Sequence, residues 1–347
     1  MDPSAFTRES SRRGLASSAG LAEVEAAMHR LAQGDRPDVA GAIAAEALES
    51  GGKRLRARLA LAAGEALGLE RERVVPWAAA CELLHQATLV HDDIQDGDRE
   101  RRGRATAWAK HGVGQAINAG DLMLMLPLVA VGTVEASPGA RARLYGAVAE
   151  AACHTARGQA LEMDLPTRDA VTWEDWVWAA EGKSGALLAL PVEGAAILAG
   201  RSDRTARALA RAFRRAGVLY QLQDDLLDLS LAKGKGRRAA DLEEGKVNAL
   251  VAAHLRLHPR EAGETLRLLR TPELRGRPGA VSALIDRLFT GGAVAFVHAQ
   301  LEASAAEFRE EPRLRAVPGL AALADELIHQ VQAAARTIRF TSEDHAA

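Results

Sequence analysis

Cysteine, net charge and long apolar runs are all scarce in this 347-residue chain, and each shortage excludes a class of protein. Two cysteines, Cys81 and Cys153, are too few for a disulfide framework or a cysteine-ligated metal centre, so we expect a reducing compartment. A formal net charge of −2 gives the whole molecule no attraction to nucleic acid or anionic membranes. We therefore predict a cytoplasmic protein without a nucleic-acid partner.

The most apolar stretch, "DLMLMLPLVAVG" at 121–132, is shorter than the roughly 20 residues that a membrane-spanning helix requires. The first residues, "MDPSAFTRESSRRG", lack the apolar centre of a signal peptide. We expect no transmembrane segment. Hydrophobic residues nevertheless make up 48% of the chain, which is enough for a large buried core.

What the sequence has in abundance is helix-forming residues, with alanine, leucine, arginine and glutamate dominant. Apolar residues recur every three or four positions over long stretches, and the alternation typical of strands is nearly absent. We predict an all-α fold with one helical domain over 18–340. The ends, 1–17 and 341–347, are predicted to be flexible.

Two clusters of aspartate, "HDDIQD" at 91–96 and "QDDLLD" at 223–228, lie at the ends of long apolar helical patterns. A mixed-charge run is ordinarily a solvated loop. Here, however, the first and last aspartates of each cluster are four residues apart and share a helix face, where like charges are unfavourable. If the clusters face each other across a cavity, their carboxylates suit Mg²⁺ that also binds phosphate oxygens. The candidate metal ligands are Asp92, Asp93, Asp96, Asp224, Asp225 and Asp228.

With these two motifs, DDIQD and DDLLD, the sequence resembles the trans-prenyltransferases, the all-trans polyprenyl diphosphate synthases, from about residue 50 to 250. The resemblance implies a single helical bundle of the isoprenoid synthase type around a central active-site cavity. It also implies a homodimer and about three Mg²⁺ (or Mn²⁺) ions per site. The implied reaction joins isopentenyl diphosphate head-to-tail to an allylic diphosphate.

The resemblance assigns four basic residues to isopentenyl diphosphate. Lys53 and Arg56 belong to "GGKRLRA", His85 to "ELLH", and Arg102 to "RRGRAT". Taken alone, the first pair could be a helix start with solvated charges, and a lone histidine on an apolar helix is more often structural. Alanine replaces the family's usual proline in both basic motifs, which leaves the proposed ligands in place.

A second set of residues is implied for the allylic diphosphate. Its ligands would be Arg101, Lys183, Lys246 and one residue of the basic loop after the second motif, either Lys235 or Arg237. Ser184 and Gln221 would face the developing allylic cation. Only six of the 44 basic residues are lysine, so each lysine position is informative. The implied catalytic residues are Lys183, Ser184, Gln221, Asp92, Asp96 and Asp224.

The length of the product is expected to depend on the floor of the cavity. Ala87 and Thr88 precede Asp92 by about one helical turn, which is 5.4 Å, roughly one isoprene unit. Because Ala87 is small, we predict products of twenty carbons or more, as in geranylgeranyl diphosphate. Met123 and Met125 are candidates for a deeper floor, and they could equally be ordinary core residues.

Two other functions compete with condensation. One is a terpene cyclase on the same fold, and the other is a noncatalytic prenyl-binding partner subunit. Cyclases often line their pockets with aromatic rings that stabilise cations, but aromatic residues are only 4% of this chain. A noncatalytic subunit is expected to lose an aspartate cluster, and both clusters are present.

Overall fold

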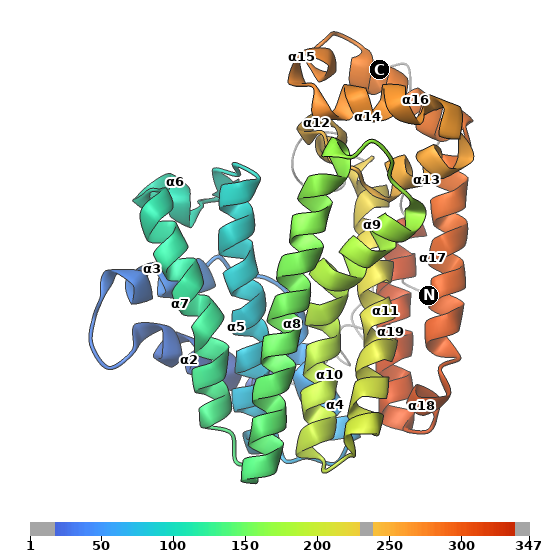
Figure 1. Ribbon diagram of the computed structural model, residues 1–347. Helices are drawn as coiled ribbons and strands as arrows, with labels where there is room; N and C mark the ends of the chain where they lie inside the picture. Colours follow the sequence, from blue (N-terminus) through green and yellow to red (C-terminus); the bar gives the residue numbers. More distant parts are fainter. Residues whose placement is uncertain (1–17, 230–238, 337–347) are drawn as a thin grey trace, which may run out of the picture. The chain divides into compact units, whose positions relative to one another are not determined.

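The computed structural model describes residues 18–229 and 239–336 of the chain. The predicted flexible ends and the loop candidates Lys235 and Arg237 lie outside these residues. The described part is almost entirely helical, which confirms the predicted fold class (Figure 1). It divides into two compact units, which are described separately. The prediction of a single domain stays a prediction.

Unit 1 comprises Met1–Ala152, Leu187–Arg211 and Ala316–Leu323, so far as they are described. Its elements are α2 (Ser18–Gln33), α3 (Val39–Leu48), α4 (Leu55–Ala66), α5 (Arg71–Gln95), β1 (Glu100–Arg101), β2 (Arg104–Ala105), α6 (Ala107–His111), α7 (Val113–Gly132), the first part of α8 (Pro138–Asp164), most of α10 (Ala186–Leu198), and the starts of α11 (Asp203–Asp228) and α19 (Pro318–Arg336).

Helix α5 is the centre of unit 1, and it packs against α2, α4 and α7 (Figure 1). Trp77 of α5 is fully buried, and its Nε1 donates a hydrogen bond to the Pro191 carbonyl of α10 at 3.0 Å. The indole lies against Gly194, where a Cβ would come within 2.0 Å of the ring. This contact requires glycine and locks α5 to α10. The C-terminal end of α5 carries the first aspartate cluster, as predicted.

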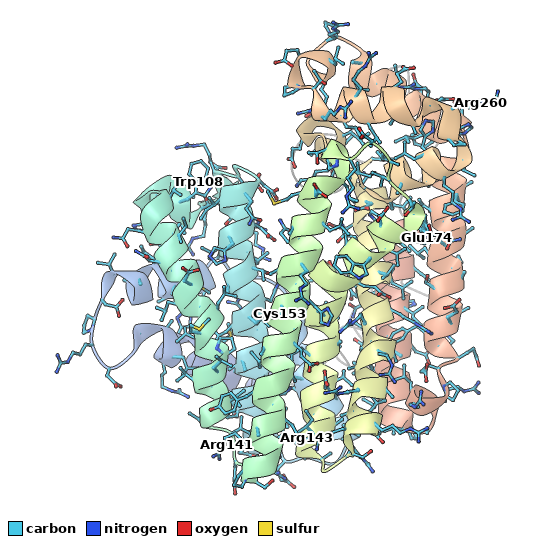
Figure 2. The ribbon with its side chains drawn as sticks, viewed as in Figure 1. Trp108, Arg141, Arg143, Cys153, Glu174 and Arg260 are labelled. Atoms are coloured by element: carbon cyan, nitrogen blue, oxygen red, sulfur yellow. The ribbon has the colours of Figure 1, made fainter. Side chains whose placement is uncertain are left out.

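The only strands in the described ranges are β1 and β2, which pair antiparallel with Glu100 opposite Ala105. This two-residue hairpin carries the basic run that follows the first cluster. It is anchored by Thr106 and Trp108, which both donate to the Asp98 carbonyl at 2.8 Å. Arg99 also stacks on the Trp108 ring, 5.1 Å from its centroid; Figure 2 labels this tryptophan.

Unit 2 comprises Cys153–Ala186, Ala212–Arg315 and Ala324–Ala347, so far as they are described. Besides the remaining parts of α8, α11 and α19, it contains the 3₁₀ turn η2 (Leu165–Thr167), α9 (Trp173–Ala180), the π-helix η3 (Glu181–Gly185), α12 (Ala240–Glu244), α13 (Ala249–Leu257), the 3₁₀ turn η5 (Pro259–Glu261), α14 (Ala262–Arg270), α15 (Pro272–Arg275), α16 (Ala280–Thr290), α17 (Ala293–Arg309) and α18 (Pro312–Arg315).

Aromatic side chains hold unit 2 together where its helices meet. Trp173 of α9 contacts Phe296 of α17 edge to face, with ring centroids 5.0 Å apart. Phe213 of α11 meets Phe308 of α17 in the same geometry at 5.2 Å. Such pairs contribute about 0.5–1.5 kcal/mol beyond the burial of their area. Helix α11 ends at Asp228, so the second aspartate cluster also closes a long helix.

Helix α7 is longer than the apolar run noted in the sequence. With 20 residues, it is long and apolar enough to cross a membrane by length and composition alone. The core helices of soluble proteins pass the same test. It packs against α3, α5 and α6. Both cysteines are free: Cys81 is buried on α5, and Cys153 is exposed on α8 (Figure 2).

Candidate active site

The basic residues predicted to bind isopentenyl diphosphate meet at the start of α4 in unit 1. Gly51, Gly52 and Arg54 all have positive φ angles, of 75°, 127° and 48°, so the chain turns sharply before the helix. Arg102 reaches this turn from the hairpin and donates a hydrogen bond to the Gly51 carbonyl. A Cβ at Gly52 would lie 2.4 Å from the Arg102 guanidinium, and the φ of 127° is one that other residues rarely adopt, so both features favour glycine here.

His85 is surrounded by the same cations. Burial lowers its pKa well below the usual 6.5, and the nearby charges of Arg56 and Arg102 lower it further. The imidazole is therefore neutral at physiological pH. Its Nδ1 is buried and has no hydrogen-bond partner among the described residues. Unit 1 thus groups His85, Arg56 and Arg102 with the glycine turn that Lys53 follows.

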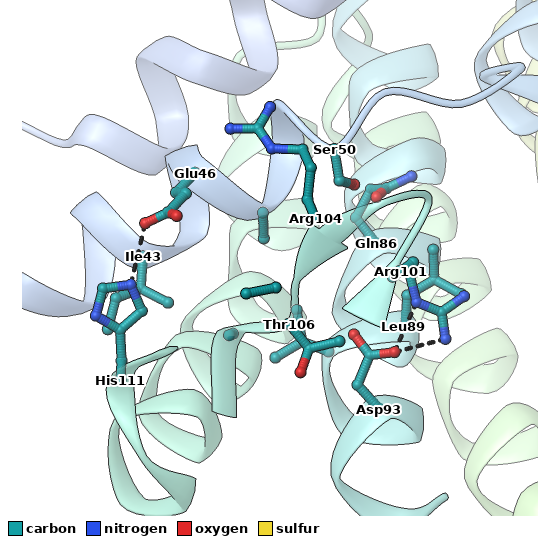
Figure 3. Close-up of a pocket in the computed structure, with 14 residues that line it drawn as sticks. Ile43, Glu46, Ser50, Gln86, Leu89, Asp93, Arg101, Arg104, Thr106 and His111 are labelled. Carbon is teal, nitrogen blue, oxygen red and sulfur yellow. Dashed lines mark hydrogen bonds and ion pairs between the residues drawn. The ribbon is translucent and has the colours of Figure 1, made fainter. Parts of the chain in front are cut away.

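In the first aspartate cluster, Asp93 is buried and forms an ion pair with a hairpin arginine. Its Oδ1 accepts hydrogen bonds from Arg101, with contacts of 2.6 Å from both Nε and Nη2 (Figure 3). Burial raises the Asp93 pKa, against the opposing effect of the Arg101 charge. Asp92 and Asp96 are partly exposed. Arg101 therefore organises this cluster by binding its middle carboxylate.

The Asp93–Arg101 pair lines a small open hollow between α3, α5, the hairpin and α6 (Figure 3). On the far side of the hollow, Glu46 pairs with Lys110 at 2.5 Å and with His111 at 3.0 Å. The hydrogen bond from Lys110 is the largest influence that lowers the Glu46 pKa. These ion pairs fasten α6 to α3.

In unit 2, Lys183 and Ser184 lie on the π-helix η3 between α9 and α10. Lys183 Nζ pairs with Glu162 Oε1 at 2.7 Å. The Ser184 hydroxyl donates to Gln221 Oε1 at 3.1 Å. The structure therefore brings three predicted catalytic residues together and adds Glu162, which the sequence reasoning missed.

Glycines on two neighbouring helices let them pack closely against this π-helix, a feature frequent at functional sites. A Cβ at Gly158 of α8 would lie 2.3 Å from the backbone nitrogen of Lys183. A Cβ at Gly217 of α11 would lie 2.2 Å from the Gly185 Cα. The π-helix is thus in backbone contact with two neighbouring helices. A glycine inside a helical pattern is the signal in the sequence that could have indicated this contact.

The second aspartate cluster shows the same division as the first. Asp225 Oδ1 accepts a hydrogen bond from Gln221 at 2.8 Å, and its Oδ2 accepts the Ala249 N–H at the start of α13 at 2.7 Å. Asp228 Oδ2 accepts the Asp241 N–H at 3.0 Å. Asp224 is exposed. A continuous hydrogen-bond chain therefore links Ser184 through Gln221 and Asp225 to α13.

The remaining predicted residues are placed separately. Lys246 pairs with Glu244 at 2.9 Å, next to the second cluster's partner Asp241. Ala87 is buried on α5, and Thr88 is half-buried, with its hydroxyl donating to the His85 carbonyl at 2.7 Å. Of the floor candidates on α7, Met123 is buried and Met125 is 56% exposed, so the structure does not bring the two side chains together.

The donor chemistry of the clusters fits a hard divalent cation. The more exposed carboxylates, those of Asp92, Asp96 and Asp224, offer oxygen ligands that solvent and a cation can reach, whereas Asp93, Asp225 and Asp228 are buried. Within the described ranges, no three acidic, histidine or cysteine side chains are grouped closely enough to hold a metal by themselves. A cation would therefore need additional oxygens, as Mg²⁺ ordinarily takes from water and phosphate.

Comparison with known proteins decides the family. A family model described as polyprenyl synthetase matches residues 38–277, well over half of the chain. This chain belongs to the polyprenyl synthetase family. The trans-prenyltransferase resemblance is therefore confirmed, and the chain is a prenyltransferase of the kind that elongates prenyl chains.

Individual members of the polyprenyl synthetase family are similar over much of the chain. Geranylgeranyl diphosphate synthase of Methanosarcina mazei is 35% identical over 231 residues, which are 66% of this chain and 71% of that relative. The (2E,6E)-farnesyl diphosphate synthase of Mycobacterium tuberculosis is 39% identical over 178 residues, 51% of this chain and 49% of its own. The crystal structure of geranylgeranyl pyrophosphate synthetase from Pyrococcus horikoshii matches with a TM-score of 0.78 and 28% identity, covering 89% of this chain and 96% of that one.

Proposed function

We propose that this family member condenses isopentenyl diphosphate with an allylic diphosphate, in a magnesium-dependent reaction, to give an all-trans polyprenyl diphosphate of twenty carbons or more. The observation that carries the proposal is the group in unit 1 of Arg56, His85 and Arg102, where arginine charges act on a buried imidazole beside the glycine turn before α4. A second diphosphate needs such a second ligand set. Relatives named geranylgeranyl synthases support the same reading.

In this proposal, Lys53, Arg56, His85 and Arg102 bind isopentenyl diphosphate. Arginine forks match phosphate oxygens in pairs, which sets the orientation of the substrate. The neutral His85 can add a hydrogen bond to phosphate without adding charge. Fixing both substrates in one assembly removes much of the entropic barrier to their reaction.

For the allylic substrate, we propose that Lys183, Arg101 and Lys246 act on its diphosphate. Divalent cations, when bound by Asp92, Asp96 and Asp224, would neutralise charge on the leaving diphosphate. As the allylic carbon–oxygen bond breaks, the oxygens of Ser184 and Gln221 would face the cation. The isopentenyl double bond then attacks that carbon, and the proton lost from the adduct passes to the released diphosphate. That both aspartate clusters serve one substrate rests on the family and the motifs.

The product length is proposed from Ala87, whose small side chain leaves the level one turn before Asp92 open to a growing prenyl tail. Thr88 lies beside it, and the buried Met123 is the remaining floor candidate on α7. Its neighbour Met125 is largely exposed and fits a different role.

We also propose that the chain forms a homodimer through α7. Val113, Ile117, Met125 and Val129 are between 41% and 56% exposed and are spaced at multiples of four residues, so they lie along one face of this helix on either side of the exposed Asp121. Tyr145 of α8, in the same unit, adds a further exposed ring. Exposed apolar stripes of this kind mark interaction surfaces, and the family resemblance names a second copy as the partner.

The test is direct. The purified chain is incubated with Mg²⁺, labelled isopentenyl diphosphate and each short allylic primer, and the products are sized by chromatography. We expect elongation of the primer, and we expect it to stop when Mg²⁺ is chelated. Asp92→Asn and Asp224→Asn should each abolish elongation. The control Asp35→Asn, which changes an exposed loop residue, should leave it intact. Diphosphate release without isopentenyl diphosphate would instead indicate a cyclase, and no turnover at all would indicate a noncatalytic subunit.

A further inference from the structure

Glu82 is a buried carboxylate next to the cationic group of unit 1, which consists of Arg56, Arg102 and the residues around His85. It is 1% exposed and precedes His85 by about one turn of α5. A buried carboxylate is unfavourable unless it is bonded. Glu82 Oε2 accepts the Ala57 N–H at 3.2 Å, and Oε1 accepts a hydrogen bond from Gln86 Nε2 at 2.9 Å. Glu82 therefore connects α5 to the first turn of α4.

The first turn of α4 depends on this connection. Arg54 occupies the N-cap position, and within the described residues its side chain makes no capping hydrogen bond. Its guanidinium donates instead to the Leu48 carbonyl at 2.5 Å and to Glu25 at 3.2 Å. The N–H of Ala57, the third residue of α4, is accepted by Glu82 from another helix. A carboxylate at a helix N-terminus satisfies a donor and is stabilised by the helix dipole.

Glu82 also supplies negative charge to this group. Burial and the charges of Arg101 and Arg54 lower the Arg102 pKa, and the charge of Glu82 opposes them. Glu82 thus accepts a hydrogen bond from α4, which carries Arg56, and lies on α5, which also carries His85. Its charge also influences Arg102 of the hairpin.

We propose that Glu82 is a positioning residue for the isopentenyl diphosphate ligands, which holds the first turn of α4 against α5 so that Arg56 and His85 keep a fixed spacing. It touches no substrate itself. The inference rests on the proposed function, because it names what positions that site.

The experiment compares Glu82→Ala, Glu82→Gln and a matched control, Glu65→Ala, which removes an exposed carboxylate from the last turn of the same α4. For Glu82→Ala we expect the KM for isopentenyl diphosphate to rise about tenfold, because the displaced first turn of α4 no longer presents Arg56 to the substrate, while the KM for the allylic diphosphate stays within about twofold. Glu82→Gln keeps an oxygen for the Ala57 N–H, and Gln86 can turn its amide to match. We therefore expect the glutamine variant to recover most of the affinity, and Glu65→Ala to match the parent.

An unchanged KM for isopentenyl diphosphate in Glu82→Ala, or an equal rise in both KM values, would overturn the positioning role. If circular dichroism shows that Glu82→Ala does not fold, Glu82→Asp takes its place. Its shorter side chain keeps the negative charge but moves the acceptor oxygens away from the Ala57 N–H. The KM of Glu82→Asp for isopentenyl diphosphate must then exceed that of Glu82→Gln. Failure of the proposed function is distinct, because the parent chain itself would not condense the two substrates.

Discussion

Replacing Gly158 with alanine tests how the π-helix presents Lys183. The added Cβ would lie 2.3 Å from the Lys183 nitrogen and 2.7 Å from the Ala179 carbonyl oxygen, both of them backbone atoms that cannot swing aside. Restoring an ordinary contact requires a shift of about 1 Å, and overpacking of this kind costs about 1–3 kcal/mol. Alanine in a helix regains up to about 1 kcal/mol over glycine. The net loss of folding stability is therefore small, about 0–2 kcal/mol.

Activity should respond much more strongly than stability. A displacement of about 1 Å in a catalytic group can reduce a rate by about 10²-fold. We expect Gly158→Ala to lower kcat by one to two orders of magnitude and to raise the KM for the allylic diphosphate, with the KM for isopentenyl diphosphate unchanged. Steady-state kinetics with labelled isopentenyl diphosphate, together with thermal denaturation, measure both quantities.

Gly146 provides the matched control because it lies on the same helix, α8, and a Cβ added there would meet no described atom within 4 Å. Gly146→Ala is expected to leave kcat unchanged and to gain up to about 1 kcal/mol of stability. If the kcat of Gly158→Ala lies within threefold of the control, the contact with α8 does not hold Lys183 in place and the reasoning fails.

Three further predictions concern unit 1. Ala87→Phe should shorten the products by filling the level before Asp92, and an unchanged chromatogram would remove Ala87 from length control. Because the pKa of His85 is lowered in the folded chain, the unfolded chain binds a proton that the folded chain does not as pH falls through about 6.5. His85 alone then lowers the stability by up to about 1.4 kcal/mol per pH unit. His254 and His298, whose pKa values are also lowered, add to the slope, so His85→Gln should reduce it without abolishing it in urea titrations at about pH 5.5–7.5. Changing Met125 and Val129 together to glutamate should convert a dimer to a monomer in sedimentation velocity, whereas a parent chain that sediments as a monomer would contradict the α7 interface.

Much of the architecture could be predicted from local pattern. Three- and four-residue apolar spacing predicts α5 and α11, and it places the aspartate clusters at their ends, where the structure has them. The scarcity of lysine makes Lys183 an informative position. These are properties of neighbouring residues along one helix or of composition, so no tertiary contact is needed to infer them.

The two methionines of α7 show where local pattern stops. Met123 and Met125 are two residues apart, and helical spacing puts them on different faces without saying which face is buried. Only packing against α5 decides that the first is buried and the second lies on the exposed stripe. Likewise, the spacing of the aspartates does not say which of them is buried, whereas the structure buries Asp93 against Arg101 and leaves Asp92 and Asp96 partly exposed.

The sequence alone determined the helical class, the family and the kinds of ligand available, because periodicity, composition and motif spacing are carried by residues close together in the chain. Tertiary structure decided which of those ligands are held, and by what. Glu82 caps a helix that begins 27 residues before it, and Gly158 contacts a backbone 25 residues beyond it. Such contacts depend on how helices pack, and no local pattern of side chains encodes their distances.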